Sequence, residues 1–212
     1  MNEKEAIRLA SEPVLLAGVK VDYIMSHLSC ADDPAHTLNA RQHAAFLRLH
    51  AMFPDMPASL ANTAGIRLGR EYCHDLVRPG IGLFRDALAL YAKILQIREI
   101  DSHDYVGYGA TFRPDGPRRI AVAGIGYADG YMRALGNSGY GVIGGHKAPC
   151  AGRVSMDLSA FDVTGAPANI CVPGSEIELI GPNVSMDDAA ARANTISYEL
   201  LTRLGSRLVR SY

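Results

Sequence analysis

The sequence predicts an α/β portion over residues 1–86, followed by a mainly β domain over residues 87–212. In the first portion, short apolar runs alternate with helix-like segments across short links, which is typical of parallel βα units. Beyond residue 86, apolar runs follow one another with few helical segments between them. Gly144-Gly145 separates two of these runs, which predicts a two-residue β-hairpin loop.

The first portion contains three predicted helices and three predicted strands. The helices are predicted from the helical spacing of their apolar residues. They are Glu3–Ala10, Thr37–Phe53 with Thr37 as its cap, and Thr63–Gly69. The strands are the short apolar runs Val19–Met25, Ala58–Ala61 and Asp75–Arg78. Residues that end parallel strands project at one face, where α/β proteins place their chemistry. The residues in these positions are His27, Asn62 and Arg78.

The second portion is predicted to be rich in strands. The predicted strands are Leu88–Ile100, Asp104–Phe112, Arg118–Tyr127, Tyr140–Ile143, His146–Cys150, Val154–Leu158 and Glu176–Ile180. Val154, Met156 and Leu158 alternate with polar residues, so this strand is expected to have one buried face. Two short helices are predicted to follow, one capped by Ser185 and one that begins at Thr195.

The composition is that of a folded enzyme and excludes several other classes of protein. Apolar residues make up 48% and charged residues 20% of the 212-residue chain, which excludes a disordered chain. The net charge of −1 gives no basic footprint for nucleic acid. The apolar runs are shorter than the roughly 20 residues that span a bilayer, and the N-terminal residues resemble no secretory signal. We therefore expect a soluble cytoplasmic protein with no nucleic-acid or membrane partner.

The cysteines are predicted to be reduced thiols. Cys30, Cys73, Cys150 and Cys171 are far apart and form no C-x-x-C pair. Two disulfides are conceivable, but a chain of this length can bury a core without them. The histidines do not cluster with the cysteines at ligand spacing, so no metal site is predicted.

Six short segments carry a resemblance to a known family. They are S-H-L at Ser26–Leu28, A-N-T-A at Ala61–Ala64, R-P-G-I at Arg78–Ile81, G-Y-A-D-G at Gly126–Gly130, G-R-V-S-M-D at Gly152–Asp157 and T-I-S-Y-E-L at Thr195–Leu200. In this order and at these separations they closely resemble bacterial alanine racemase, a fold-type III enzyme that uses pyridoxal 5'-phosphate. The resemblance implies a partial (β/α)8 barrel, its last units only, followed by a C-terminal mainly β domain. Three parallel strands alone cannot close a barrel, for which eight is the usual count.

The resemblance also implies that part of the catalytic apparatus lies outside this sequence. The family's cofactor-bonded lysine lies on the first barrel strand, which would precede Met1. The sequence contains the lysines Lys4, Lys20, Lys93 and Lys147. None of them lies in a sequence context that matches that of the family's lysine. We therefore expect this chain alone to bind the cofactor without a covalent bond and not to catalyse racemisation.

By resemblance, Tyr127 is the catalytic base on one face of the substrate α-carbon, opposite the missing lysine. A phenol titrates near pH ~10, so this role needs cationic neighbours. Arg78 faces the pyridine nitrogen of the cofactor, and His27 hydrogen-bonds Arg78. The sequence contexts of these residues also fit purely structural roles. Tyr127 could pack its ring at the end of a strand, Arg78 could bind carbonyl groups, and His27 could be a structural histidine.

The remaining implied roles concern the phosphate and the substrate. By resemblance, the cofactor phosphate is bound by the backbone N–H groups of Gly80 and Ile81, by the Thr63 hydroxyl and by the Tyr198 phenol. Backbone turns and hydroxyl groups of this kind bind phosphate. Met156 binds the substrate carboxylate through its backbone amide, in the active site of the opposite subunit of a homodimer. Its spacing also fits core packing, which would leave the amide free for this contact.

The leading functional prediction is the interconversion of L- and D-alanine, which supplies D-alanine for peptidoglycan. One alternative is a broader amino-acid racemase of the same fold. A second alternative is a non-catalytic fragment or partner subunit that needs another chain to supply the lysine.

Overall fold

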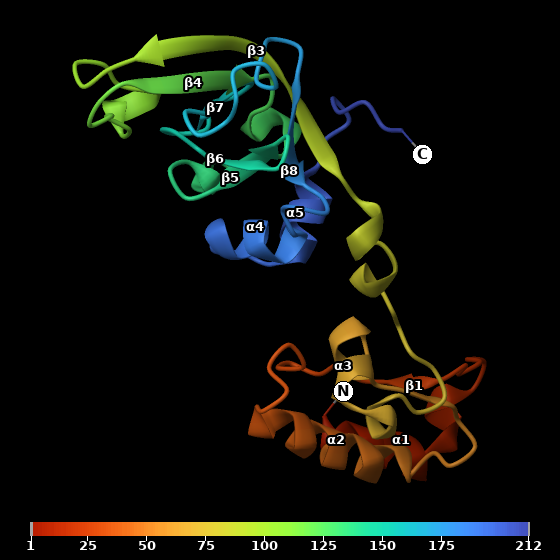
Figure 1. The fold of residues 1–212 in the computed structure, drawn as a ribbon. Coiled ribbons are helices and arrows are strands. Elements are labelled where there is room, and N and C mark those ends of the chain that lie inside the picture. Colours follow the sequence, from red (N-terminus) through yellow and green to blue (C-terminus); the bar gives the residue numbers. More distant parts are fainter. Residues whose placement is uncertain (1, 212) are drawn as a thin grey trace. The chain divides into compact units, whose positions relative to one another are not determined.

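The chain divides into two compact units, Met1–Phe84 and Arg85–Tyr212, and the computed structural model describes residues 2–211 (Figure 1). We call them the N-terminal unit and the C-terminal unit. Each has its own sheet, with two strands in the first and six in the second. The units are therefore described one at a time.

The N-terminal unit is built from parallel βα connections. Its helices are α1 (Glu3–Ser11), α2 (Thr37–His50) and α3 (Thr63–Leu68), and its strands are β1 (Ile24–Met25) and β2 (Ala58–Ser59). β1 and β2 pair in parallel, and a parallel bridge between Asn62 and Arg78 adds a third extended segment. The apolar core under the helices consists of Leu28, Ala31, Phe46, Ala58 and Leu60.

All three predicted helices of this unit are present, whereas its strands are shorter than predicted. The Val19–Met25 run pairs only at Ile24 and Met25, and the Asp75–Arg78 run forms a ladder contact only at Arg78. An extended run becomes a strand only where a second backbone accepts its hydrogen bonds, which local sequence does not specify. The cap of α2 is His36, whose ring accepts from the N–H of Leu38, and not Thr37.

The C-terminal unit is an antiparallel sheet of six strands in the order β6-β5-β8-β3-β4-β7. These strands are β3 (Leu90–Ile100), β4 (Arg118–Ala123), β5 (Tyr140–Ile143), β6 (His146–Pro149), β7 (Ser159–Asp162) and β8 (Glu176–Ile180). A bridge between Cys150 and Phe161 joins the two edges, so the sheet is nearly closed. Phe161 is fully buried in this core. The unit ends with helices α4 (Met186–Arg192) and α5 (Ser197–Arg203).

The predicted hairpin is confirmed. β5 and β6 pair directly on either side of Gly144 and Gly145, whose φ angles are 53° and 82°. Two consecutive positive φ values define the turn that matches the twist of a two-residue hairpin, and glycine adopts them without a steric penalty. The cap of α4 is confirmed as well, because Ser185 Oγ accepts from the N–H of Asp188 at 3.1 Å.

Two predicted strands of this unit are wrong. The Asp104–Phe112 segment is a turn closed by a bridge between Val106 and Phe112, with a short 3₁₀ turn at Tyr108–Ala110. The Val154–Leu158 segment is a loop closed by the N–H of Ser155, which donates to the carbonyl of Leu158. Alternation therefore gave a false indication, because Met156 and Leu158 are exposed and do not pack in the core.

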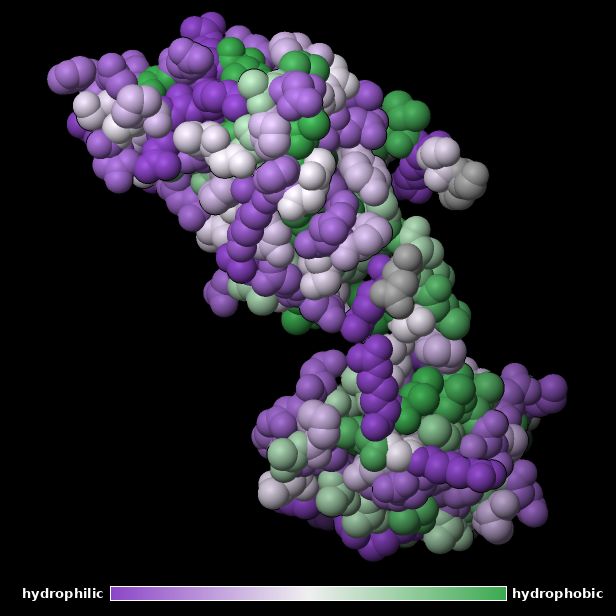
Figure 2. Space-filling model, in the orientation of Figure 1, coloured by the Kyte–Doolittle hydropathy of each residue, from purple (hydrophilic) through white to green (hydrophobic). Residues whose placement is uncertain are grey.

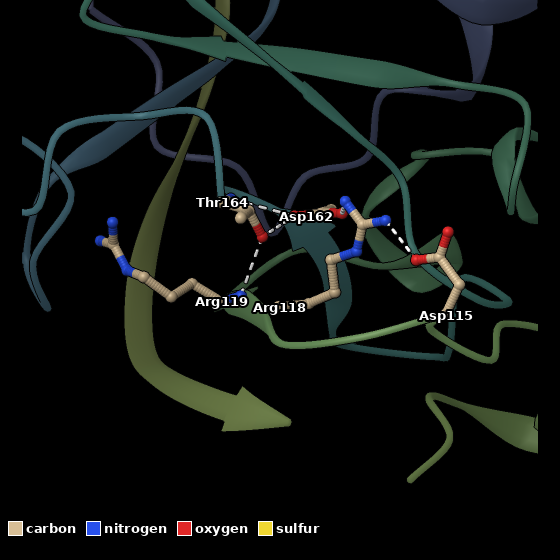
Figure 3. A network of polar contacts seen from close by, with 5 residues as sticks. All are labelled: Asp115, Arg118, Arg119, Asp162 and Thr164. Carbon is tan, nitrogen blue, oxygen red and sulfur yellow. Dashed lines mark hydrogen bonds and ion pairs between the residues drawn. The ribbon is translucent and has the colours of Figure 1, made fainter. Parts of the chain in front are cut away.

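A polar network ties the start of β4 to the end of β7 (Figure 3). Arg118 contacts Asp115 at 2.5 Å and Asp162 at 3.7 Å. The hydrogen bond from Arg118 holds the pKa of Asp115 below its usual value. Thr164 Oγ1 accepts from the N–H of Arg119 at 2.9 Å and donates to Asp162. These contacts hold the loops at one end of the sheet.

Large apolar side chains also reach the surface, as the green atoms among purple ones in Figure 2 show. On the N-terminal unit they include Val14, Leu15, Val19, Met25 and Leu83. An apolar surface of this kind is typical of a segment that packs against another polypeptide segment. Among the described residues, no helix is long and apolar enough to cross a bilayer.

The four cysteines are unpaired. Burial raises the pKa of the Cys150 thiol to about 11 and also raises that of Cys171. Both of these thiols are therefore unreactive at neutral pH. Within residues 2–211, no group of three or more His, Cys, Asp or Glu could hold a metal ion.

A cluster of aromatic and histidine rings joins α2 to the turn after α3. The His74 ring lies 5.3 Å from that of His43 and 5.1 Å from that of Phe46. The Nε2 atoms of His43 and His74 are buried and have no hydrogen-bond partner within the part of the chain that the structure describes. Burial lowers the pKa of His74, and the nearby His43 and His50 rings lower it further, against a smaller opposing effect of Asp75.

We predict that His74 makes the stability of the N-terminal unit sensitive to acid. Because its pKa is lower in the folded state than the ordinary value of 6.5, its contribution is present above that pH and is lost as the pH falls. His74→Asn, which tolerates the positive φ of 49° at this position, should lose less stability between pH 7 and 5 than the parent. Urea unfolding followed by circular dichroism measures this. The control is His103→Asn, which replaces an exposed histidine of the C-terminal unit and should retain the parental pH dependence. Equal acid sensitivity of both variants would contradict the prediction.

Candidate active site

Arg78 occupies the point where the parallel segments of the N-terminal unit end. Its Nη1 donates to Ser59 Oγ at 2.5 Å, and its Nη2 donates to the carbonyls of Ser26 at 2.8 Å and Leu60 at 3.2 Å. Ser26 follows β1, and Ser59 is the last residue of β2. One guanidinium group therefore connects the ends of both strands, as expected for a residue at the chemical face of a parallel sheet.

His27 lies directly after Ser26 and is exposed. Its carbonyl accepts from the side-chain amide of Gln42 at 3.3 Å. Within residues 2–211, no hydrogen bond joins the His27 ring to Arg78. The structure therefore places His27 beside the carbonyl that holds Arg78, without the direct contact that the resemblance implies.

The Thr63 hydroxyl shapes the turn that follows Arg78. Its Oγ1 accepts from the backbone N–H groups of Gly80 at 3.0 Å and Gly82 at 3.2 Å. A Cβ atom at Gly82 would lie only 2.8 Å from the Thr63 methyl group, so the turn needs glycine there. A hydroxyl that accepts two hydrogen bonds still has its own proton to donate. Thr63 thus holds the turn around Ile81 and can donate to an anion.

In the C-terminal unit, the backbone brings Tyr127 and Met156 together. The N–H of Tyr127 donates to the carbonyl of Ser155, and the N–H of Ala128 donates to that of Met156, both at 3.0 Å. The side chain of Tyr127 is 43% exposed and that of Met156 is 54% exposed. A Cβ at Gly126 would lie 2.2 Å from the carbonyl oxygen of Met156, so only glycine permits this approach.

Two carboxylates and Arg207 fix the same pair of loops. Asp129, which is buried, accepts from the N–H of Gly126 at 2.9 Å. Arg207 contacts Asp129 at 3.2 Å and Asp157 at 2.7 Å. Asp157 and Asp129 raise the pKa of the Arg207 guanidinium. The loop that carries Tyr127 and the loop that carries Met156 are therefore held by both backbone and ionic contacts.

Tyr127 faces a cavity of about 400 Å³ that Arg133 and Arg203 also line. Nε and Nη2 of Arg203 both donate to Glu199, at 2.9 and 2.7 Å. Tyr127 therefore lines the same cavity as two guanidinium groups, one of which is paired with a carboxylate.

A second tyrosine, which the sequence reasoning missed, has a comparable position. Tyr108 is 72% exposed and lines a cavity of about 420 Å³ together with Arg153 and Ser155. A Cβ at Gly109 would lie 3.0 Å from a guanidinium nitrogen of Arg153, so that cation borders the tyrosine turn. The sequence signal for this turn was the pair of glycines that flank Tyr108, but we predicted a strand over these residues.

Tyr198 lies in the first turn of α5 and is exposed. The predicted site residues therefore fall into two groups. The N-terminal unit holds His27, Thr63, Arg78, Gly80 and Ile81, and the C-terminal unit holds Tyr127, Met156 and Tyr198. Within residues 2–211, the contacts described above join Thr63 to Gly80 and the Tyr127 loop to the Met156 loop, and none of them joins Tyr198 to either loop.

Two family models cover the chain. Alanine racemase, N-terminal domain, matches residues 1–87, and alanine racemase, C-terminal domain, matches residues 87–212. The chain belongs to the alanine racemase family. The resemblance carried by the six sequence segments is thus confirmed.

Similar proteins agree with this family assignment. An alanine racemase of Rhodospirillum rubrum is 48% identical over 96% of this chain and 58% of its own length. A biosynthetic alanine racemase of Agrobacterium fabrum is 43% identical over 98% of this chain and 59% of its own length. The crystal structure of the Bartonella henselae alanine racemase with covalently bound pyridoxal phosphate has a TM-score of 0.91 and 37% identity, covering 100% of this chain and 62% of that one. The chain thus spans about three fifths of these relatives, and the predicted fold class, a partial barrel with a β domain, is confirmed.

We predict that Gly126→Ala disrupts the alanine racemase loop that carries Tyr127. The new Cβ would collide with the backbone at Met156, so the two loops must separate. We expect a loss of about 1–3 kcal/mol in the free energy of unfolding, the usual range for overpacking. Thermal and urea unfolding measure the loss. The control, Gly116→Ala, introduces a Cβ with nothing within 4 Å and should unfold as the parent does. Two variants of equal stability would mean that the loops do not need this close approach.

Proposed function

We propose that this chain supplies the phosphate-binding, pyridine-binding and substrate-facing residues of an alanine racemase that uses pyridoxal 5'-phosphate. The reaction is the interconversion of L- and D-alanine in the cytoplasm, which provides D-alanine for peptidoglycan. Residues 1–86 contribute the last units of the barrel, and residues 87–212 form the β domain. The observation that carries the proposal is the Arg78 guanidinium held at the strand ends, with the turn that Thr63 holds directly after Arg78 in the chain, supported by the family of the chain.

The residues present fit the phosphate group. The Thr63 hydroxyl, the turn at Gly80 and Ile81, and the phenol of Tyr198 are donors of the kind that phosphate accepts from. No acidic side chain takes part in the contacts of Thr63 that shape the turn, because both of its partners there are backbone N–H groups. Because the N–H groups of Gly80 and Gly82 already donate to Thr63, the donors that this turn offers to a phosphate are the Thr63 hydroxyl proton and the backbone N–H of Ile81, which has no acceptor among residues 2–211.

Arg78 fits the pyridine nitrogen. All three groups that accept from its guanidinium are neutral, so its positive charge is not balanced by a carboxylate in these contacts. An arginine stays protonated and donates to the nitrogen without giving up its proton. When bound, the cofactor withdraws electrons from the substrate α-carbon. Arg78 limits that withdrawal, which disfavours transamination and leaves proton transfer as the main outcome.

Racemisation needs two different proton-transferring groups on opposite faces of the α-carbon. In the proposal this chain provides a tyrosine for one face, and the family's lysine serves the other. Tyr127 is the predicted residue, and its place beside the Met156 loop supports it. Tyr108 is the second candidate, favoured by its greater exposure and by the cavity that it shares with Arg153.

Met156 would hold the substrate carboxylate through its backbone N–H, while its carbonyl oxygen is already engaged by Ala128. The exposed position of the Met156 loop is compatible with insertion into the site of a second subunit, as in the proposed homodimer. A broader amino-acid racemase remains the alternative enzyme. A partner subunit without its own lysine is the non-catalytic alternative.

We expect a chimera to show alanine racemase activity. This chain replaces the matching region of the Rhodospirillum rubrum enzyme, whose remaining residues supply the lysine portion. Arg78→Glu in the chimera should slow racemisation by about 100-fold, the scale of one lost electrostatic contact, and should increase transamination. D-alanine and pyruvate formation measure the two reactions. The control is Arg41→Glu, the same charge change at an exposed position of α2. An inactive chimera would overturn the proposed activity, and unchanged rates in Arg78→Glu would remove Arg78 from the pyridine nitrogen.

The same chimera decides between the two tyrosines. Tyr127→Phe and Tyr108→Phe each remove one hydroxyl and leave the ring in place. Replacement of the proton-transferring residue should lower kcat by roughly 10²–10⁴-fold, whereas replacement of the other should leave kcat within a few-fold. Loss of the α-proton from one alanine enantiomer only, measured by deuterium exchange, would identify the face. If neither variant is impaired, neither tyrosine transfers the proton.

A further inference from the structure

The carboxylate of Asp187, in the first turn of α4, connects two segments of the C-terminal unit. Its Oδ2 lies 2.9 Å from Arg85 Nη1, and its Oδ1 accepts a hydrogen bond from Ser197 Oγ. Arg85 is the first residue of the C-terminal unit, and Ser197 is the first residue of α5. One side chain therefore fixes both the entry of the chain into this unit and the start of its last helix.

One of these two segments carries a residue of the proposed phosphate site. Ser197 directly precedes Tyr198. α5 has no side-chain hydrogen bond at its N-cap, Ile196. The contact between Asp187 and Ser197 is therefore one of the side-chain restraints on the helical turn that carries the Tyr198 phenol, together with the contact between Thr195 and Glu199.

The Arg85 side chain depends on the same carboxylate. Its Nε is buried and has no hydrogen-bond partner among residues 2–211. Asp187 itself is 55% exposed, and ion pairs of this kind add little to overall stability. We therefore expect this ion pair to affect the positions of the two segments more than the free energy of unfolding.

We infer that Asp187 is a positioning residue for the cofactor phosphate, which it serves by holding the turn that carries the Tyr198 phenol. The inference rests on the proposed function. It specifies that the effect of Asp187 passes through Ser197 and Tyr198, and that it concerns the phosphate group and not the ring of the cofactor.

The adjacent residue provides a matched control. Asp188 also lies in the first turn of α4, but its carboxylate pairs with Arg192 at 2.9 Å. Asp187→Asn and Asp188→Asn thus remove the same charge from neighbouring positions of one helix. Only the first breaks a contact with α5 and with Arg85.

The test titrates the chain with pyridoxal phosphate and, in parallel, with pyridoxal, which lacks the phosphate. Binding is followed by cofactor absorbance and by the ³¹P chemical shift. Asp187→Asn should raise the Kd for pyridoxal phosphate by roughly 3- to 10-fold, as one lost charged hydrogen bond can do, without changing that for pyridoxal. Ser197→Ala should act in the same direction, Asp188→Asn should not, and Asp187→Glu should recover part of the affinity. In a Tyr198→Phe background, Asp187→Asn should add little.

The outcomes separate this inference from the proposed function. If the unaltered chain shows no saturable binding of pyridoxal phosphate, the proposed phosphate site is wrong and the inference falls with it. If the chain binds and the two Asp→Asn variants are equal, only the inference is overturned. If Asp187→Asn weakens pyridoxal and pyridoxal phosphate equally, Asp187 supports the fold in general and does not position the phosphate site.

Discussion

The hydrogen bonds of the Arg78 guanidinium are the constraint on which the candidate site depends. They reach acceptors that follow or end two parallel strands. Such a geometry arises only when both strands run in the same direction and end at the same level. Removal of the guanidinium would leave the part-buried Ser59 hydroxyl and Leu60 carbonyl without this donor, which costs more than the hydrogen bonds contribute. The cation is therefore both a structural connection and the uncompensated charge that a ligand would meet.

Close backbone approaches form the second constraint, and they explain why short motifs identify this family. Gly82 allows the Thr63 hydroxyl to hold the turn after Arg78, and Gly126 allows the Tyr127 loop to lie against Met156. In each case a side chain at the glycine would collide with the group that it faces. Gly126 lies in the G-Y-A-D-G motif, and Gly82 directly follows the R-P-G-I motif. A motif with such a glycine in it or beside it records a contact between segments far apart in the chain, which makes it more specific than its length suggests.

Sequence reasoning predicted those elements whose physical cause is local. The hairpin at Gly144-Gly145 and the cap at Ser185 depend on residues within four positions, and both are confirmed. The predicted strands at Asp104–Phe112 and Val154–Leu158 are wrong because neither a β-rich composition nor alternation reveals whether a partner backbone is present. The same limit applies to the site. Periodicity could not place Tyr127 beside Met156, and Tyr108 was overlooked because its flanking glycines were interpreted as part of a strand.

The distribution of amines and phenols indicates which half of the chemistry this chain can hold. Lys20 pairs with Asp22, Lys93 pairs with Glu176, and Lys147 lies 3.9 Å from the Tyr140 ring centroid. Lys4 is exposed on α1. Each of these amines thus lies on the surface of its unit. The Arg78 site and the cavities with Tyr108 and Tyr127 instead present guanidinium, hydroxyl and phenol groups. Proton transfer on opposite faces of one carbon needs two groups in opposite protonation states. In the proposed reaction the chain offers a phenol for one of them, and the amine for the other comes from a segment beyond these residues.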